Sequence, residues 1–164
     1  MQRRTFLVMS AGALATTGCL SDEERLQVTT SSNAPPPTRI ERVLLWLPPQ
    51  TGLASAKFGE AFVSAFAPYG VTVRVDRAKA LELNRGEEQA ASMSEMEATH
   101  RLEVEVATLS QGGSMPSSQS TFIVSFFIGT STRPVATFRY VTSSYYDYAL
   151  AGLVVKKLRG LGYL

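Results

Sequence analysis

Hydrophobic and polar residues follow each other in a pattern that predicts a sheet flanked by helices. Strict alternation is typical of strands with one buried face, and unbroken apolar runs are typical of strands covered on both faces. One further strand is expected directly after Pro134, a position at which proline is tolerated. The predicted strands are 42–47, 71–75, 102–106, 121–129 and 135–142.

Three segments with helical spacing separate or follow these strands. Phe58, Phe62 and Phe66 recur every four residues and predict a helix over 53–67 with an aromatic buried face. A polar helix is expected over 87–98 and a closing helix over 145–161. The element order is β-α-β-α-β-β-β-α, with parallel pairing early and hairpins later.

This order predicts an α/β (α+β) fold with a single mixed sheet of about five strands and helices packed on it. The strand over 121–129 is the most apolar, so it is expected inside the sheet, covered on both faces. Its expected hairpin partners are 101–109 and 134–142, because consecutive strands usually pair. The first strand-helix-strand unit joins the sheet through one of these two partners, and the alternatives stay open.

The residues before the first predicted strand have a different composition. Arg3 and Arg4 precede an uncharged run that is too short to span a bilayer, which is typical of an export signal. Ser, Thr and Pro dominate the second half of 20–39, which indicates a flexible tether. The predicted organisation is a signal peptide over 1–18, a tether over 19–39 that begins with Cys19, and one domain over 40–164.

Two short motifs in the signal carry a family resemblance. Thr16-Thr17-Gly18-Cys19 resembles the lipobox of bacterial lipoproteins, and Gln2-Arg3-Arg4-Thr5-Phe6-Leu7 resembles the twin-arginine export signal. The lipobox resemblance implies cleavage before Cys19, acylation of that residue with chains such as palmitate, and a persistent membrane anchor. Leu20 stands where an inner-membrane retention Asp is found in that family, which favours the outer membrane and a periplasm-facing domain. A generic export route remains the alternative to the twin-arginine one.

The order of elements also resembles small α/β domains of periplasmic lipoproteins, such as the amino-terminal domain of TolB and the penicillin-binding-protein activators. A shared order of elements implies a similar fold and assigns no function.

Charge and composition exclude several classes of protein. Removal of 1–18 takes away Arg3 and Arg4, leaving 14 basic and 14 acidic residues, so no nucleic-acid partner is expected. One cysteine and one histidine cannot form an internal disulfide or a Cys/His zinc site. We therefore expect neither metal nor cofactor.

Few residues qualify as candidates for chemistry. His100 is more simply explained as a surface or strand-edge residue than as a general base. Glu103 and Glu105 share one face of a strand, where paired carboxylates can act as acid and base, although a solvated face explains them more simply. The leading hypothesis is a non-catalytic accessory, binding or scaffold module of the cell envelope. The alternative is a hydrolytic enzyme that uses Glu103 and Glu105 or His100.

Aromatic residues are the candidates for contact with an envelope protein partner. Tyrosine and tryptophan bury large areas and keep a polar group for hydrogen bonding, which favours them at interfaces. The expected partner-binding residues are Tyr145 and Tyr146 first and Trp46 second.

Overall fold

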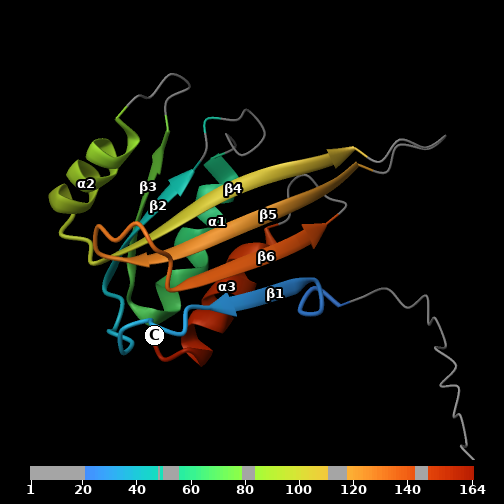
Figure 1. Cartoon of the computed structure of the whole chain (residues 1–164), viewed down its shortest axis with the longest axis horizontal. Helices are drawn as coiled ribbons and strands as arrows, with labels where there is room; N and C mark the ends of the chain where they lie inside the picture. Colours follow the sequence, from blue (N-terminus) through green and yellow to red (C-terminus); the bar gives the residue numbers. More distant parts are fainter. Residues whose placement is uncertain (1–20, 48, 50–55, 79–83, 111–117, 143–147) are drawn as a thin grey trace, which may run out of the picture.

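The computed structural model describes residues 21–47, 49, 56–78, 84–110, 118–142 and 148–164, and its elements follow the predicted order with one strand added at the start (Figure 1). The strands are β1 (Leu26–Thr30), β2 (Arg42–Leu47), β3 (Thr72–Arg77), β4 (His100–Ser110), β5 (Ser118–Ile128) and β6 (Ala136–Thr142). The helices are α1 (Ala56–Phe66), the short 3₁₀ helix η1 (Ala67–Tyr69), α2 (Arg85–Glu95) and α3 (Ala149–Gly160).

The strands form one mixed sheet in the order β1-β6-β5-β4-β2-β3. The α/β class and the single mixed sheet are confirmed, with six strands where about five were expected. β5 lies between β4 and β6 in antiparallel pairing, as predicted. β2 pairs in parallel with both β3 and β4, so the first strand-helix-strand unit joins the sheet through β4. This choice between the two partners had stayed open.

β1 corrects the prediction of a flexible tether. Residues 26–30 pair antiparallel with β6, from Leu26 opposite Tyr140 to Thr30 opposite Ala136. Leu26 is buried in the main core, and Val28 packs against it. The segment therefore belongs to the fold, because alternating apolar residues cover a strand edge that would otherwise be exposed.

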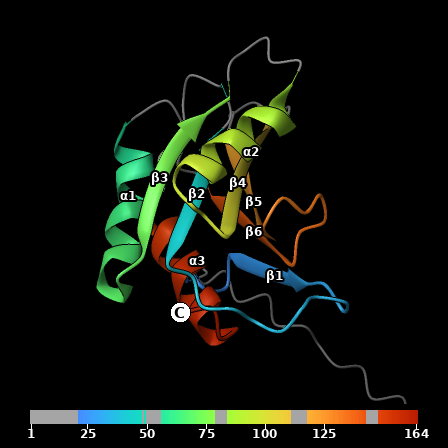
Figure 2. The ribbon, with the colours of Figure 1, turned by 90° about the vertical axis from the view of Figure 1, so that its left-hand side faces the viewer.

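The helices cover the two faces of the sheet unequally (Figure 2). α1 and α3 pack side by side on one face, where Phe58, Phe62 and Phe66 are all buried as predicted. α2 lies on the opposite face, where Met93 packs on Leu44 and Trp46. We call these the two-helix face and the α2 face.

Close packing of α1 depends on a glycine. A β-carbon at Gly59 would lie 2.9 Å from Cγ1 of Val75, so only glycine lets α1 approach β3 this closely. η1 then ends at Gly70, whose φ of 71° is left-handed, and the chain enters β3.

β5 is buried more completely on one face than on the other. Phe122, Val124 and Phe126 point into the two-helix core and are at most 1% exposed. On the α2 face, Phe127 is buried, while Ile123 is only half-buried. The expectation of full cover on both faces is thus correct for the two-helix face and wrong for part of the other.

Candidate functional site

The candidate catalytic residues of β4 lie on opposite faces of the sheet. His100 points into the two-helix core and is 0% exposed. Glu103 and Glu105 share the α2 face, as the alternation predicted. Successive side chains of a strand point to opposite faces, so the sheet itself separates His100 from Glu103 and Glu105. These three residues do not form a common cleft.

His100 is a core residue, and its prediction as a surface or strand-edge residue is wrong. Its ring stacks on Phe126 with centroids 5.5 Å apart and meets the edge of Tyr163 at 6.2 Å. Its Nδ1 lies 2.8 Å from Oγ1 of Thr99, and its Nε2 lies 3.2 Å from Oγ1 of Thr38. Burial lowers the pKa of His100 below its ordinary value, so the neutral ring is favoured.

Both nitrogens of the neutral ring are satisfied by hydroxyl groups, which can donate or accept. His100 therefore joins the segment before β2 to the start of β4. Its position is explained by structure without a catalytic role.

Glu103 is held between two arginines on the α2 face. Nε of Arg101 donates to its Oε1 at 2.7 Å, and Nη2 of Arg85 donates to its Oε2 at 2.8 Å. Arg101 also donates to the carbonyl of Ser131 at 3.1 Å, and its guanidinium lies 4.4 Å from the ring centre of Phe127. Glu103 thus joins β4 to the start of α2, whereas Glu105 is exposed.

Trp46 is buried rather than available to a partner. It is 2% exposed and packs with Leu44 and Met93 beneath α2. Its prediction as a partner-binding surface residue is corrected: β2 is an interior strand with a helix on each face, so its apolar side chains are covered.

Several predicted site residues lie outside the described residues: Arg3, Arg4, Cys19, Tyr145 and Tyr146. Tyr148, which follows Tyr145 and Tyr146 in the sequence, is 42% exposed at the start of α3. Tyr140, the tyrosine that precedes them in the sequence, is fully buried in β6. The predicted lipidation of Cys19 and the predicted binding role of Tyr145 and Tyr146 stay predictions.

A compact turn over 21–25 precedes β1, and we call it the anchor-side turn because it follows the predicted lipidation site Cys19. The amide and hydroxyl of Ser21 donate to Oε2 of Glu24 at 2.7 and 2.9 Å. Glu24 and Arg25 donate their amides to the carbonyl of Ser21, which closes the turn. Glu23 forms an ion pair with Lys156 of α3, and these contacts lower the pKa of the Glu23 carboxyl.

Sequence reasoning missed both the anchor-side turn and β1. The alternation of Leu26 and Val28 with polar residues was the available signal, although it is short.

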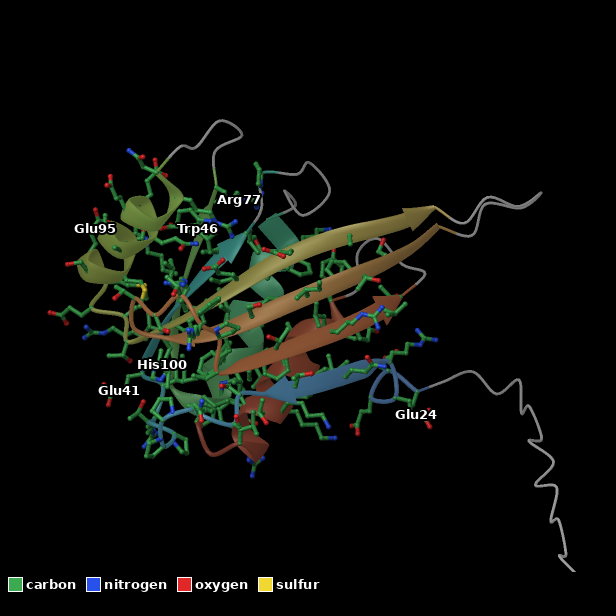
Figure 3. All side chains as sticks on the ribbon, viewed as in Figure 1. Glu24, Glu41, Trp46, Arg77, Glu95 and His100 are labelled. Atoms are coloured by element: carbon green, nitrogen blue, oxygen red, sulfur yellow. The ribbon has the colours of Figure 1, made fainter. Side chains whose placement is uncertain are left out.

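A surface hollow of about 580 Å³ lies at the other end of the sheet. Its lining includes Thr38 and Thr99 and the ion pair between Arg42 and Glu97. Figure 3 shows Glu24 of the anchor-side turn and His100 at opposite ends of the sheet. His100 contacts Thr38 and Thr99, which line the hollow. The register agrees, because Leu26 is level with Val106 of β4 across β6 and β5, six residues beyond His100.

Within the described ranges, no group of three or more His, Cys, Asp or Glu residues is arranged to hold a metal ion. None of the helices described is long and apolar enough to cross a bilayer.

Comparison with known proteins identifies similar folds. No family model and no curated protein matches the chain. A PelC dodecamer from Paraburkholderia phytofirmans superposes with a TM-score of 0.51 at 16% identity, covering 85% of this chain and 99% of that one. A substituted PelC dodecamer from the same organism gives 0.51 at 14% identity, covering 85% and 98%. At such low identity the likeness establishes the fold alone.

Bacterial lipoproteins also occur among the structural neighbours. Lipoprotein GNA1162 from Neisseria meningitidis has a TM-score of 0.36 at 10% identity, covering 73% of this chain and 96% of that one. A minor lipoprotein from Acinetobacter baumannii has a TM-score of 0.35 at 14% identity, with coverage of 72% and 88%. Scores this low carry no argument about function.

Proposed function

We propose that this chain is a lipid-anchored lipoprotein of the bacterial cell envelope that serves as a non-catalytic accessory or scaffold module. The non-catalytic part of this proposal is supported by the structural contacts that His100 and Glu103 already make. His100 is enclosed in the core with both ring nitrogens bonded, and Glu103 is held by two arginines on the other face. A common cleft for these carboxylates and His100 would have favoured the hydrolytic alternative, and the sheet separates them.

The anchor is supported by the sequence of the export region. Cys19 follows an uncharged run and the small residues Thr17 and Gly18, as in bacterial lipoproteins. Acylation with more than one chain, as in that family, would supply a stable attachment to a membrane, because a single acyl chain gives only marginal binding. Leu20 after the cysteine favours the outer membrane, with the domain facing the periplasm.

A scaffold role is supported by the fold. The PelC structures, which share it, are described as dodecamers. We propose that this chain also assembles with copies of itself. Head-to-tail assembly of identical subunits joins two different surfaces of one subunit. β1 and β3 are the two edge strands of this sheet, and their outer edges are two such surfaces.

The anchor is tested with Cys19→Ala in cells that express the full-length chain. The wild-type protein is expected in the outer-membrane fraction. Mass spectrometry of its amino-terminal peptide should show that Cys19 is acylated. The variant is expected to accumulate as uncut precursor or to leave the membrane. An unmodified Cys19 in the mature wild-type protein would refute the anchor.

Assembly is tested separately by native mass spectrometry of the detergent-extracted protein. A homo-oligomer of one defined size is expected. A monomer at all concentrations would refute self-assembly and leave the anchor unaffected.

A further inference from the structure

We propose that the anchor-side turn rests against the lipid headgroups, so that the domain is held on the bilayer in one orientation. This inference rests on the lipid anchor at Cys19 proposed above. It concerns which surface of the domain faces the bilayer and how closely. The partner is the headgroup layer of the membrane that holds the acyl chains.

The first step is the length of the link. Ser21 is the second residue after Cys19. Extended backbone spans at most about 3.6 Å per residue, so the Cα atoms of Cys19 and Ser21 lie within about 7 Å of each other. A flexible tether over 19–39 would instead reach on the order of 25 Å. The pairing of β1 with β6 removes that reach, because the fold already holds the chain from Ser21 onward.

The second step is the attachment of the turn to the domain. Glu23 contacts Lys156 of α3, and the carbonyl of Arg25 accepts a hydrogen bond from the amide of Val141 in β6. The hydroxyl of Tyr140 also lies 3.5 Å from Oδ1 of Asp22. The turn thus connects to β1, β6 and α3 at once. A short link to such a turn restricts the orientation of the whole domain as well as its distance from the bilayer.

The third step is the charge of the surface that would meet the headgroups. Three acidic residues of the turn are accompanied by three basic ones from the turn and from α3, so the local formal charge is zero. These residues are Asp22, Glu23, Glu24, Arg25, Lys156 and Lys157. Such a surface is neither strongly attracted nor repelled by anionic lipids, which draw polybasic segments. The short link therefore sets the orientation of the domain on the bilayer. This orientation should be insensitive to salt and to lipid charge.

The fourth step is the place of the other end of the sheet. Six residues of β4 separate His100 from the level of Leu26, which corresponds to about 20 Å of strand. Figure 1 shows β1 beginning at the end of the sheet toward which the β4 arrow points. The hollow between Thr38 and Thr99 then faces away from the bilayer, where it is accessible to a partner in the aqueous compartment.

The test measures the depth of single fluorophores on the full-length, lipidated protein. Cys19 is the only cysteine and loses its thiol on acylation, so an introduced cysteine is the only site for a thiol-reactive label. Asp22→Cys labels the anchor-side turn, and Thr132→Cys labels an exposed position at the opposite end. Gln27→Cys, exposed on β1, serves as a second anchor-side site if Asp22→Cys melts without a cooperative transition.

The labelled proteins are reconstituted into phosphatidylcholine vesicles that carry a nitroxide on the headgroup. Quenching is expected to be severalfold stronger at residue 22 than at residue 132, and unchanged by salt or by added anionic lipid. A flexible Gly/Ser insertion of about twelve residues between Leu20 and Ser21 adds a reach on the order of 20 Å. It should lower the quenching at residue 22 to the level at residue 132.

The outcomes separate this inference from the proposed anchor. A protein with a free Cys19 thiol that does not enter vesicles refutes the anchor itself. A lipidated, vesicle-bound protein with equal quenching at residues 22 and 132 overturns the orientation and leaves the anchor standing. Strong quenching at residue 22 that persists after the insertion overturns the short link as its cause.

Discussion

The two faces of the sheet use different interactions to hold their helices. On the two-helix face, the contacts of α1 and α3 with the sheet are almost wholly apolar, built on Phe62, Phe122 and Phe126. On the α2 face, a small apolar cluster around Trp46 is combined with the ion pairs of Glu103. β4 contributes to both faces through alternate residues.

This difference shows that the location of a polar residue, rather than its type, determines its role. His100 is a polar residue on the apolar face, where hydroxyls and aromatic rings surround it. Arg101, the next residue, is a charged residue on the other face, where it is 6% exposed and needs its carboxylate partner. A buried polar group is tolerated where its hydrogen bonds are made, and both residues satisfy this condition.

Truncation in the two-helix core should have the largest effect. Phe126→Ala removes an aromatic ring that is 0% exposed, stacks on His100 and meets Tyr163 edge to face. We expect a loss of about 3–5 kcal/mol in the free energy of unfolding, measured by urea denaturation. A loss below about 1 kcal/mol, the scale of surface changes, would show that this face does not depend on its apolar core.

The edge of the same face should respond less. Leu26→Ala removes a side chain that is 7% exposed and should cost about 2–3 kcal/mol, the low end for core leucines. Gln27→Ala, one residue further and exposed on the other face, is the control and should stay within about 0.5 kcal/mol. If Leu26→Ala and Gln27→Ala lower the free energy of unfolding by the same amount, in both thermal and urea unfolding, then β1 is not docked and the tether prediction is right.

The ion pairs of the α2 face can be separated from general surface charge with a matched pair. Glu103→Gln leaves the buried guanidinium of Arg101 without its carboxylate, and we expect a loss of about 1–3 kcal/mol on urea unfolding. Glu105→Gln makes the same chemical change at an exposed site two residues away and should stay within about 0.5 kcal/mol. If the two variants unfold alike, α2 does not depend on Glu103.

The smallest effect expected is a pH dependence from His100. Burial lowers its pKa in the folded chain, so the unfolded chain binds more protons as the pH falls through 6.5. Its contribution to stability is therefore present above that pH and lost below it. The free energy of unfolding should decrease between about pH 7.5 and 5.5, the range in which histidine titrates.

The control for this pH dependence is His100→Gln. His100 is the only histidine, and glutamine keeps hydrogen-bonding capacity without titrating. The variant should show a flatter pH profile over the same range. A wild-type slope that persists in the variant would assign the dependence to other groups.

Much of the fold followed from local pattern. The aromatic repeat of α1, the alternation in β3 and β4, the apolar run of β5 and the segment after Pro134 that forms β6 all predicted elements that the structure contains. The interior place of β5 was predicted correctly because only a central strand can bury so many apolar residues. β1 was missed because five residues give a weak periodic signal next to a proline-rich segment.

The candidate site was harder to predict than the fold, because it depends on contacts between distant residues. The shared face of Glu103 and Glu105 followed from their spacing. The burial of His100 depends on Thr38 and Tyr163, which lie far away in the sequence. The burial of Trp46 depends on α2 being placed over β2.

The sequence by itself therefore determined the elements other than β1, their order and the predicted export and lipidation signals, because these depend on composition and on periods of a few residues. Only the tertiary structure decided the pairing of β2 with β4, the docking of β1 on β6, and the burial of His100 and Trp46. Such contacts join residues that are distant in the chain, and their free energy exists only when the whole sheet and its helices are assembled.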